Sequence, residues 1–229
     1  MPVNTIPRTR LPREVRMEQT LRVAHDLFAE RGYGPVTMDE VAASVGVTKP
    51  LLYNYFGNKE RLYLACMEPA GDALVSAVVG AVQRTSTPEQ ALRSGIHAFF
   101  AFVDKDRNSW RVLFDETQPL EGGIALRVAA YRAEIAELVA EVMLAQLTPP
   151  SRLQVDALSV ALLGAAEALV RWWLRTESLT ASETAELLIR TVEPGLAAGV
   201  AAVRKKTSGS PGSSPAQVDL ASAQGGAGA

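Results

Sequence analysis

The sequence of 229 residues is poor in the residues from which disulfides and metal sites are built. It has one cysteine, Cys66, and two histidines, His25 and His97. A single cysteine excludes a disulfide within the chain and fits a reducing, cytoplasmic environment. So few sulfur and imidazole ligands leave no basis for a zinc site. We therefore predict no metal and no cofactor, and we expect Cys66 to be a small buried apolar residue rather than a reactive thiol.

Signals for export, for a membrane span and for catalysis are also missing. The arginines near the N-terminus are not followed by an apolar stretch, so no signal peptide is expected. The most apolar run, residues 157–170, is interrupted by Glu167, and we expect no segment long and apolar enough to span a membrane. The nucleophile-elbow, phosphate-loop and dinucleotide-binding glycine patterns of enzymes are absent. We expect a protein that is not an enzyme; an enzyme with isolated acidic residues in a helical pocket is the alternative.

The net charge of −2 is unevenly distributed along the chain. Residues 1–64 contain 9 Lys and Arg against 7 Asp and Glu, whereas the remainder contains 14 against 18. The distribution of charge, more than its total, decides whether a surface attracts nucleic acid. The small basic surplus makes the N-terminal part the candidate for a nucleic-acid contact.

What is present is sequence that favours helix throughout. Alternating strand patterns are absent, and helix starts are marked by three capping boxes and one further N-cap residue, at Thr37, Thr87, Thr180 and Asn58. Gly32 and Gly57 stand where helix C-termini favour a left-handed residue. We predict an all-α fold of about nine helices, over residues 13–31, 38–44, 49–56, 59–83, 88–106, 109–117, 122–147, 152–176 and 181–203.

The predicted helices fall into two functional parts with loose ends. The composition after residue 206 changes to Gly, Ser, Ala and Pro, which cannot bury enough apolar surface to offset chain entropy. We predict a flexible basic arm at 1–12, a three-helix helix-turn-helix DNA-binding domain at 13–58, a larger helical effector-binding and dimerisation domain at 59–206, and a disordered tail at 207–229.

Residues 38–56 have the pattern of a helix-turn-helix. An apolar face on the first helix is followed by Gly46, which supplies a tight turn, and Leu52 and Phe56 anchor the second helix on the first. Thr48 is expected to cap the second helix with its side chain. In this motif the second helix enters the major groove of DNA with its N-terminal residues at the base edges.

The second helix has more polar side chains than a core helix needs. Lys49 is placed to donate to guanine, Tyr53 and Asn54 to bond base edges or phosphates, and Pro50 and Leu51 to touch thymine methyl groups. Thr37 and Lys59 lie at helix N-termini, where phosphates bind. Taken singly, each is more often a packing or solvated surface residue; together they favour DNA. The predicted DNA-binding residues are Thr37, Thr48, Lys49, Pro50, Leu51, Tyr53, Asn54, Tyr55 and Lys59, with Arg8 and Arg10 of the arm as candidates for the minor groove.

Residues 37–67 resemble the N-terminal signature of the TetR-family transcriptional regulators. That signature is a threonine-initiated helix, a V-G-V turn, a recognition helix ending in L-Y-x-[HY]-F, and a lysine opening helix four. The matching positions are Thr37, Ala42, Gly46, Val47, Leu52, Tyr53, Tyr55, Phe56 and Lys59. The resemblance covers about residues 13–65. It implies a homodimer with a ligand pocket in the C-terminal domain, and a repressor released from a palindromic double-stranded DNA operator by a small-molecule effector.

Two further patterns bear on those implications. Small residues at Ala157, Ala161, Gly164, Ala165 and Ala168, and a second stripe at Leu188, Val192, Gly195 and Gly199, would let helices approach closely. We predict a homodimer through residues 152–176 and 181–203; packing within one chain is an equal alternative. Aromatic residues are predicted to line a site for a largely apolar, acyl-type effector: Phe99, Phe100, Phe102, Trp110, Phe114, Tyr131 and Trp172. Plain core is their commoner role, and a DNA-binding dimer without a ligand is the corresponding alternative.

Overall fold

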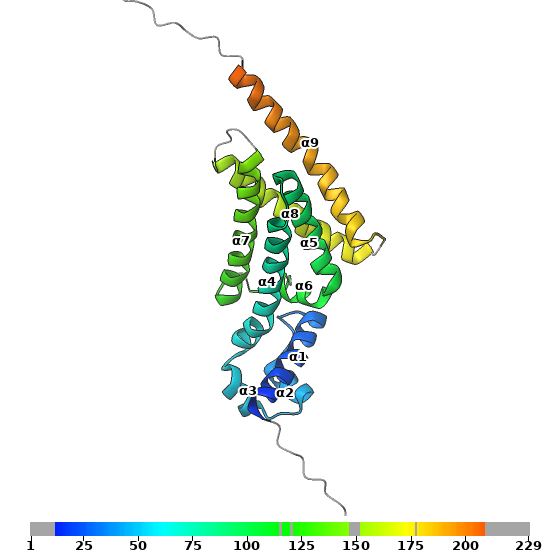
Figure 1. The fold of residues 1–229 in the computed structure, drawn as a ribbon. Coiled ribbons are helices and arrows are strands. Elements are labelled where there is room, and N and C mark those ends of the chain that lie inside the picture. The colour runs from blue at the N-terminus through cyan, green and yellow to red at the C-terminus, as the bar shows by residue number, and fades with distance from the viewer. Residues whose placement is uncertain (1–11, 115, 120, 147–151, 177, 209–229) are drawn as a thin grey trace, which may run out of the picture.

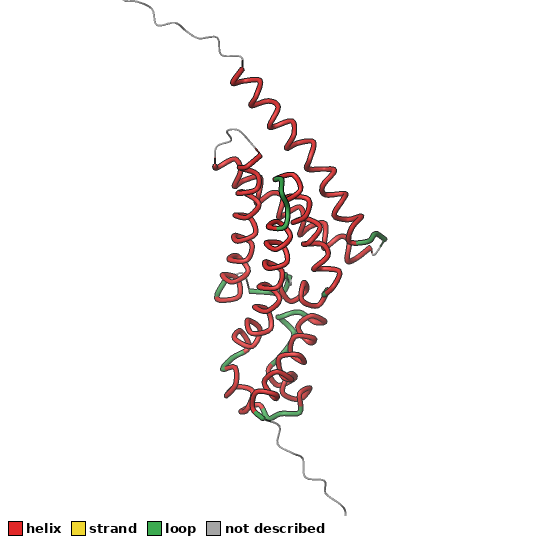
Figure 2. The backbone as a smooth tube through the Cα atoms, in the orientation of Figure 1, coloured by secondary structure: helices red, strands yellow, loops and turns green. Residues whose placement is uncertain are grey.

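The computed structural model of the protein describes residues 12–114, 116–119, 121–146, 152–176 and 178–208. These residues form nine α-helices and no strand, which confirms the predicted all-α fold (Figures 1 and 2). The predicted arm, apart from Pro12, and the predicted tail, apart from residues 207 and 208, lie outside the described residues. The helices are α1 (Arg13–Arg31), α2 (Met38–Val45), α3 (Lys49–Phe56), α4 (Lys59–Gln83), α5 (Pro88–Lys105), α6 (Arg107–Leu113), α7 (Gly123–Gln146), α8 (Arg152–Thr176) and α9 (Ala181–Ser208).

The predicted helix starts and stops are confirmed at most ends. The hydroxyl oxygens of Thr37, Thr87 and Thr180 accept hydrogen bonds from backbone N–H groups three residues on, at 3.2, 3.3 and 3.2 Å. The Asn58 side chain accepts from the backbone of Arg61 at 2.8 Å. Gly32, Gly46 and Gly57 have φ of 79°, 74° and 79°, the left-handed region that glycine adopts without strain.

The sixth helix differs from the prediction of residues 109–117. It begins at Arg107, because the Asp106 carboxylate accepts from the Ser109 N–H at 2.9 Å and so caps an earlier turn. It ends at Leu113, where the Gln118 amide donates to the carbonyls of Val112 and Leu113 at 2.8 and 3.1 Å. These side-chain hydrogen bonds satisfy terminal backbone N–H and carbonyl groups that have no partner within the shorter helix.

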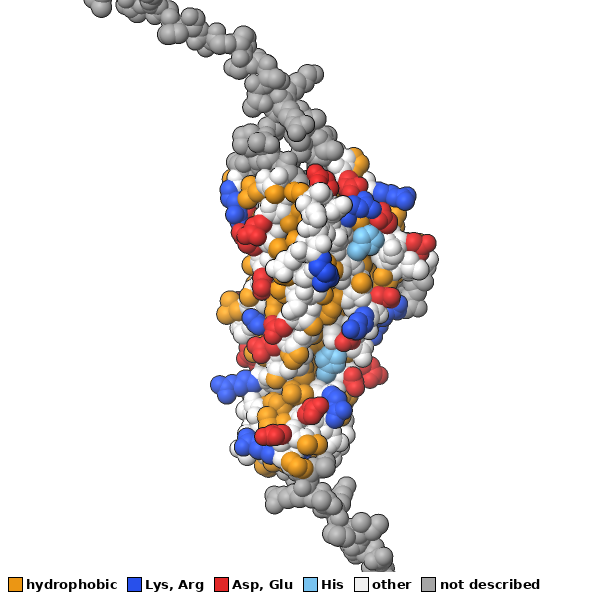
Figure 3. Space-filling model, in the orientation of Figure 1, with side chains coloured by type: hydrophobic (Ala, Val, Ile, Leu, Met, Phe, Trp, Pro, Cys, Tyr) orange, Lys and Arg blue, Asp and Glu red, His pale blue; other side chains and the backbone are white. Residues whose placement is uncertain are grey.

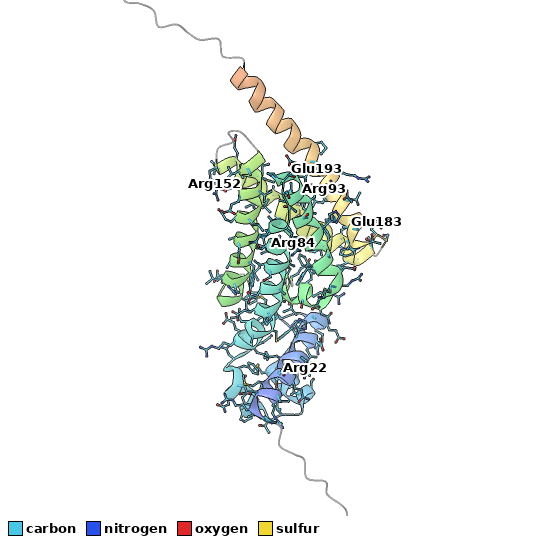
Figure 4. All side chains as sticks on the ribbon, viewed as in Figure 1. Arg22, Arg84, Arg93, Arg152, Glu183 and Glu193 are labelled. Carbon is cyan, nitrogen blue, oxygen red and sulfur yellow. The ribbon has the colours of Figure 1, made fainter. Side chains whose placement is uncertain are left out.

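The molecule is elongated, with α1–α3 at one end and α5–α9 at the other (Figure 1). The long helix α4 belongs to both parts: it packs against α1 and α3 below and against α5, α6 and α7 above. Helix α6 returns to contact α1, and α9 lies along α5 and α8. Arg93 of α5 and Glu193 of α9, which lie together in Figure 4, form an ion pair of 2.8 Å along this last contact.

One hydrophobic core runs through both parts of the chain. Tyr63 of α4 is fully buried and packs its ring edge-on against Phe28 of α1, with centroids 4.8 Å apart. Its hydroxyl donates to the carbonyl of Val112 in α6 at 2.6 Å. The predicted boundary at residues 58 and 59 therefore divides elements that share buried contacts.

The expectation that no segment is long and apolar enough to span a membrane is wrong for two helices. By length and composition alone α4 and α8 both qualify. Half of the relevant stretch of α4 is buried in the protein, as expected of a core helix, but only 39% of that of α8 is buried. The exposed part of α8 includes Leu153, which is 79% exposed, and Val160, which is 64% exposed. An apolar face of this kind needs a partner.

Candidate nucleic-acid interface

The turn between α2 and α3 is built as the sequence predicts. Gly46 adopts a left-handed conformation, and its N–H and that of Val47 donate to the last carbonyls of α2. This arrangement ends α2 sharply. Leu52 is fully buried and Phe56 is 8% exposed, so they fix α3 against the rest of the N-terminal core.

The opposite face of α3 is exposed. Lys49, Pro50 and Asn54 are exposed, Tyr53 is 41% exposed, and Leu51 is half-buried. Two apolar anchors thus hold a short helix on which Lys49, Pro50, Tyr53 and Asn54 face solvent. That is the arrangement needed to place side chains against base edges in a major groove.

Thr48 corrects one detail of the prediction. It occupies the N-cap position of α3, but its side chain makes no cap hydrogen bond. Pro50, the second residue of the helix, has no N–H to offer, and the N–H of Leu51 donates instead to the Thr48 carbonyl at 3.0 Å. The predicted side-chain cap at Thr48 is therefore wrong.

Lys49 is held by a neighbour on α2. Its Nζ donates to Oδ2 of Asp39 at 2.7 Å, and both side chains are more than half exposed. The hydrogen bond to Asp39 raises the pKa of Lys49 above its usual value. This ion pair between α2 and α3 takes one of the three N–H donors of Lys49, and sequence reasoning did not foresee it.

The structure adds Arg13 and Arg16 to the predicted residues. Together with Thr48, Leu51 and Asn54 they line a groove of about 710 Å³ between α1 and α3. The Arg13 guanidinium lies 5.4 Å from the centre of the Tyr55 ring, so Tyr55 contacts a cation on the same surface. Cations at a helix N-terminus oppose the helix dipole. Arg13 and Arg16, which flank Glu14 in the first turn of α1, are the signal in the sequence by which this surface could have been found.

Lys59 and Glu60 are consecutive residues of α4 that contact different parts of the molecule. The Nζ of Lys59 donates to the carbonyl of Gly34 at 3.0 Å and lies 4.3 Å from the centre of the Tyr33 ring; burial lowers its pKa. The Glu60 carboxylate accepts from the N–H of Gly123, the first residue of α7, at 2.7 Å. Lys59, predicted to contact a phosphate, is thus already bonded within the chain, while Thr37 is exposed beside α2.

Charges of both signs are interspersed over the surface, including the end formed by α1–α3 (Figure 3). Near α3, Arg13 and Arg16 form no ion pair with a described residue. Lys49 is paired with Asp39, and Arg31 is paired with Glu40. The polar surface is therefore patterned locally rather than uniformly basic.

The aromatic residues predicted to bind an effector are not all brought together. Phe99 and Trp110 are 4% and 3% exposed with ring centroids 5.5 Å apart, and Phe114 lies 4.3 Å from Trp110. Trp110 and Phe114 also border a groove of about 830 Å³ where α1, α6 and α8 meet. These three residues form one cluster.

The other predicted residues lie elsewhere. Phe102 borders a separate groove of about 540 Å³ between α1 and α4. The ring of Tyr131 packs over Gly71 of α4, and its hydroxyl donates to Asp72 at 2.8 Å; burial, with Asp72 next, raises its pKa to about 12. Phe100 packs against Trp173, whereas Trp172 is 40% exposed on α8. Among the described residues no three His, Cys, Asp or Glu side chains are grouped to hold a metal.

Two family models match the chain in tandem. Residues 21–66 match the bacterial regulatory proteins of the tetR family, and residues 88–193 match the tetracyclin repressor-like C-terminal domain. A solved TetR-like transcriptional regulator from Rhodococcus sp. RHA1 is 32% identical, with a TM-score of 0.69 over 82% of this chain and 99% of that one. This chain belongs to the TetR family.

Other relatives of this TetR-family member match part of the chain or share its fold. The HTH-type transcriptional activator FasR of Mycolicibacterium smegmatis is 40% identical over 119 residues, 52% of this chain and 54% of that one. The chain spans about half the length of the first curated relatives it matches. The structure of AibR in complex with isovaleryl coenzyme A and operator DNA shares the fold, at 21% identity and a TM-score of 0.60 over 76% of this chain and 96% of that one.

Proposed function

We propose that the protein is a DNA-binding transcriptional regulator that acts as a homodimer in the cytoplasm and responds to a small, largely apolar effector. The observation that carries the proposal is the exposed polar face of α3, which is held in place by the buried side chains of Leu52 and Phe56. The family model that matches residues 21–66 includes this helix. Regulators of this family are not enzymes, and the chain offers no catalytic motif that favours an enzyme.

The proposed roles in DNA binding follow from side-chain chemistry. Lys49 donates to guanine, Tyr53 and Asn54 bond base edges or phosphates, and Pro50 and Leu51 contact thymine methyl groups. The phosphate contacts come from side chains around α3. They are proposed for Thr37, Thr48, Tyr55 and Lys59, with Arg13 and Arg16 added.

The proposed dimer uses α8, with α9 beside it. Ala157, Ala161, Gly164, Ala165 and Ala168 are all exposed in the single chain, and a Cβ added at Gly164 meets nothing within 4 Å. This favours a partner chain over packing within the chain, which sequence alone left open. On α9 the stripe is less consistent, because Leu188 is buried within the chain, and Gly199 lies beyond the described side chains. A two-fold axis beside α8 would present two α3 helices to one duplex.

The effector site is proposed around Trp110 and Phe114, the predicted aromatic residues that border an open groove. The AibR complex contains an acyl thioester ligand together with operator DNA, which supports an acyl-type effector for this chain. Binding between α1, α6 and α8 would change the distance between the two α3 helices. These must lie about 34–36 Å apart to enter successive major grooves, so a small shift releases a repressor. Pro69, inside α4, is a proposed hinge; a static kink is the alternative.

The test is binding of the purified protein to the DNA upstream of its own gene, followed by fluorescence anisotropy at several salt concentrations. We expect one dimer per palindromic site and a log–log salt slope of about −0.9 for each phosphate contacted. Lys49→Ala should relax sequence preference, whereas Arg13→Ala should weaken binding to all sequences alike. Equal binding to every duplex by the unmodified protein would contradict the proposal.

A further inference from the structure

The groove where α1, α6 and α8 meet has walls from both functional parts of the chain. We name it the junction groove and define it by Glu30 of α1, Trp110 and Arg111 of α6, Phe114, and Arg171 and Arg175 of α8. Its volume is about 830 Å³, enough for a ligand of the size that protein pockets accept. One wall therefore belongs to the DNA-binding helices and the other to the sensor helices.

The sensor wall carries three arginines whose charges are poorly compensated. Arg171 and Arg175 are one turn apart on α8, a spacing at which like charges destabilise a helix. The nearest carboxylate to Arg171 recorded in the structure is Glu167 at 3.9 Å, whose oxygens already accept from Arg132 at 2.8 and 2.9 Å. Arg111 and Arg175 form no ion pair with any described residue.

The acidic groups of the groove lie mainly on the opposite wall. Asp26 and Glu30 belong to α1, and Glu116 follows α6. None of the three forms an ion pair with an arginine in the described part of the chain. The recorded neighbour of the Asp26 carboxylate is the imidazole Nδ1 of His25, at 3.6 Å. Arg31 of α1 also borders the groove, but it is paired with Glu40, so the arginines without a close carboxylate of their own are those of α6 and α8.

The surface between these charges is apolar. Trp110 and Phe114 have ring centroids 4.3 Å apart, and Leu174 of α8 borders the same space. A guanidinium binds carboxylate or phosphate oxygens through paired N–H groups, whereas aromatic and aliphatic side chains take an acyl or alkyl portion.

We propose that the junction groove binds an amphipathic anion, with a carboxylate or phosphate group on Arg111, Arg171 and Arg175 and an apolar tail on Trp110, Phe114 and Leu174. This inference rests on the proposed function, because it assigns the chemical class of the effector. A ligand seated there touches α1 on one side and α6 and α8 on the other. It therefore selects one orientation of the DNA-binding helices relative to the sensor helices.

The test compares three probes with the same tail: decanoate, decyl phosphate and decanol, each below its critical micelle concentration. Binding to the full chain is measured by isothermal titration calorimetry. We expect at least one anion to bind at least about tenfold more tightly than decanol, since charged hydrogen bonds to arginine are lost with the alcohol. The stronger of the two anions identifies the head group.

Arg111→Gln and Arg175→Gln should each weaken binding of that anion about tenfold. Arg84→Gln, an exposed arginine at the C-terminus of α4 that does not line the groove, should leave it unchanged. Equal binding of decanol and both anions, or equal loss in all three variants, overturns the proposal. So does dissociation of the dimer in the Arg175 variant, which would assign that residue to the subunit interface.

DNA binding without any probe is measured in the same samples. If the unmodified protein binds its operator and the anions do not bind, the junction groove is misassigned while the regulator function stands. If no operator is bound in the absence of probes, the proposed function itself fails.

Discussion

Helices α3 and α8 differ in what they leave uncovered. Helix α3 buries two apolar anchors and exposes hydrogen-bonding side chains around Tyr53 and Asn54. Helix α8 buries its apolar core face and exposes a second apolar face around Leu153 and Val160. Each helix leaves one face uncovered, but the faces differ, and the partners proposed for them differ accordingly: a DNA duplex for α3 and an apolar helix surface for α8.

The largest effect is expected from a charge placed on the apolar face of α8. Ala161→Glu should raise the dimer dissociation constant more than about 100-fold, because an unpaired buried carboxylate costs several kcal/mol. Operator binding should fall with it. Sedimentation velocity over a range of concentrations measures the change.

The matched control is Ala133→Glu, the same substitution at an exposed position of α7. If both variants dissociate equally, α8 has no special part in the dimer. The exposed apolar face of α8 would then have no partner chain to explain it, and the contrast drawn with α3 would fail.

A second prediction concerns the interior that holds the two helices in place. A Cβ at Gly71 would lie 2.2 Å from Cε2 of Tyr131. Gly71→Ala should therefore displace the ring and its hydrogen bond to Asp72, and lower the free energy of unfolding by about 1–3 kcal/mol. Urea denaturation measures this loss. Ser76→Ala, at an exposed site on the same helix, should change it by less than about 0.5 kcal/mol; an equal loss would show that the contact with Tyr131 is unimportant.

A smaller effect sharpens the description of α3. The Asp39 carboxylate holds Lys49 and repels DNA phosphates. Asp39→Asn should therefore raise the affinity of the protein for a random-sequence duplex about threefold and raise its affinity for the operator by a smaller factor. The salt slope should steepen by about 1 if Lys49 then joins a phosphate. Asp104→Asn, an exposed acid on α5 away from α3, is the control. A proportional rise on both duplexes would mean that Asp39 adds repulsion but no selectivity.

The smallest effect is a pH dependence at the contact between α1 and α6. Burial of Asp106 raises its pKa, but hydrogen bonds from Ser109 and the nearby His25 outweigh it, and the net pKa is lowered. Its contribution to stability is therefore present above its ordinary value near 3.8 and lost as the pH falls through the lowered value. Asp106→Asn keeps a cap but should flatten the pH dependence of the unfolding free energy below about pH 5. An unchanged acid limb in urea titrations would contradict this.

The sequence was most informative where local chemistry decides the structure. Capping boxes, the left-handed Gly46 and the Leu52 and Phe56 anchors depend on residues within one or two turns, and they placed α2 and α3 correctly. The extent of α6 was mispredicted because Gln118, which follows the helix, satisfies its last carbonyls. Such a contact has no periodic signature.

The effector residues were harder to predict for the same reason. Aromatic spacing indicates which residues are buried, but it does not say whether rings meet one another, as Trp110 and Phe114 do, or pack over a glycine, as Tyr131 does. The pairing of Lys49 with Asp39 joins residues ten positions apart on two helices. The distance in space between these two side chains depends on the angle between α2 and α3 at the Gly46 turn. The sequence alone does not give that angle.

The first turn of α4 connects neighbours in opposite directions. Lys59 is tied to the loop before α2 through Gly34, and the next residue, Glu60, is tied to the start of α7 through Gly123. Consecutive side chains on a helix diverge by about 100°, which is why one turn can hold both segments. Two adjacent residues thus fasten the N-terminal helices and the sensor helices to the same turn, and replacing either residue would release one segment while leaving the other held.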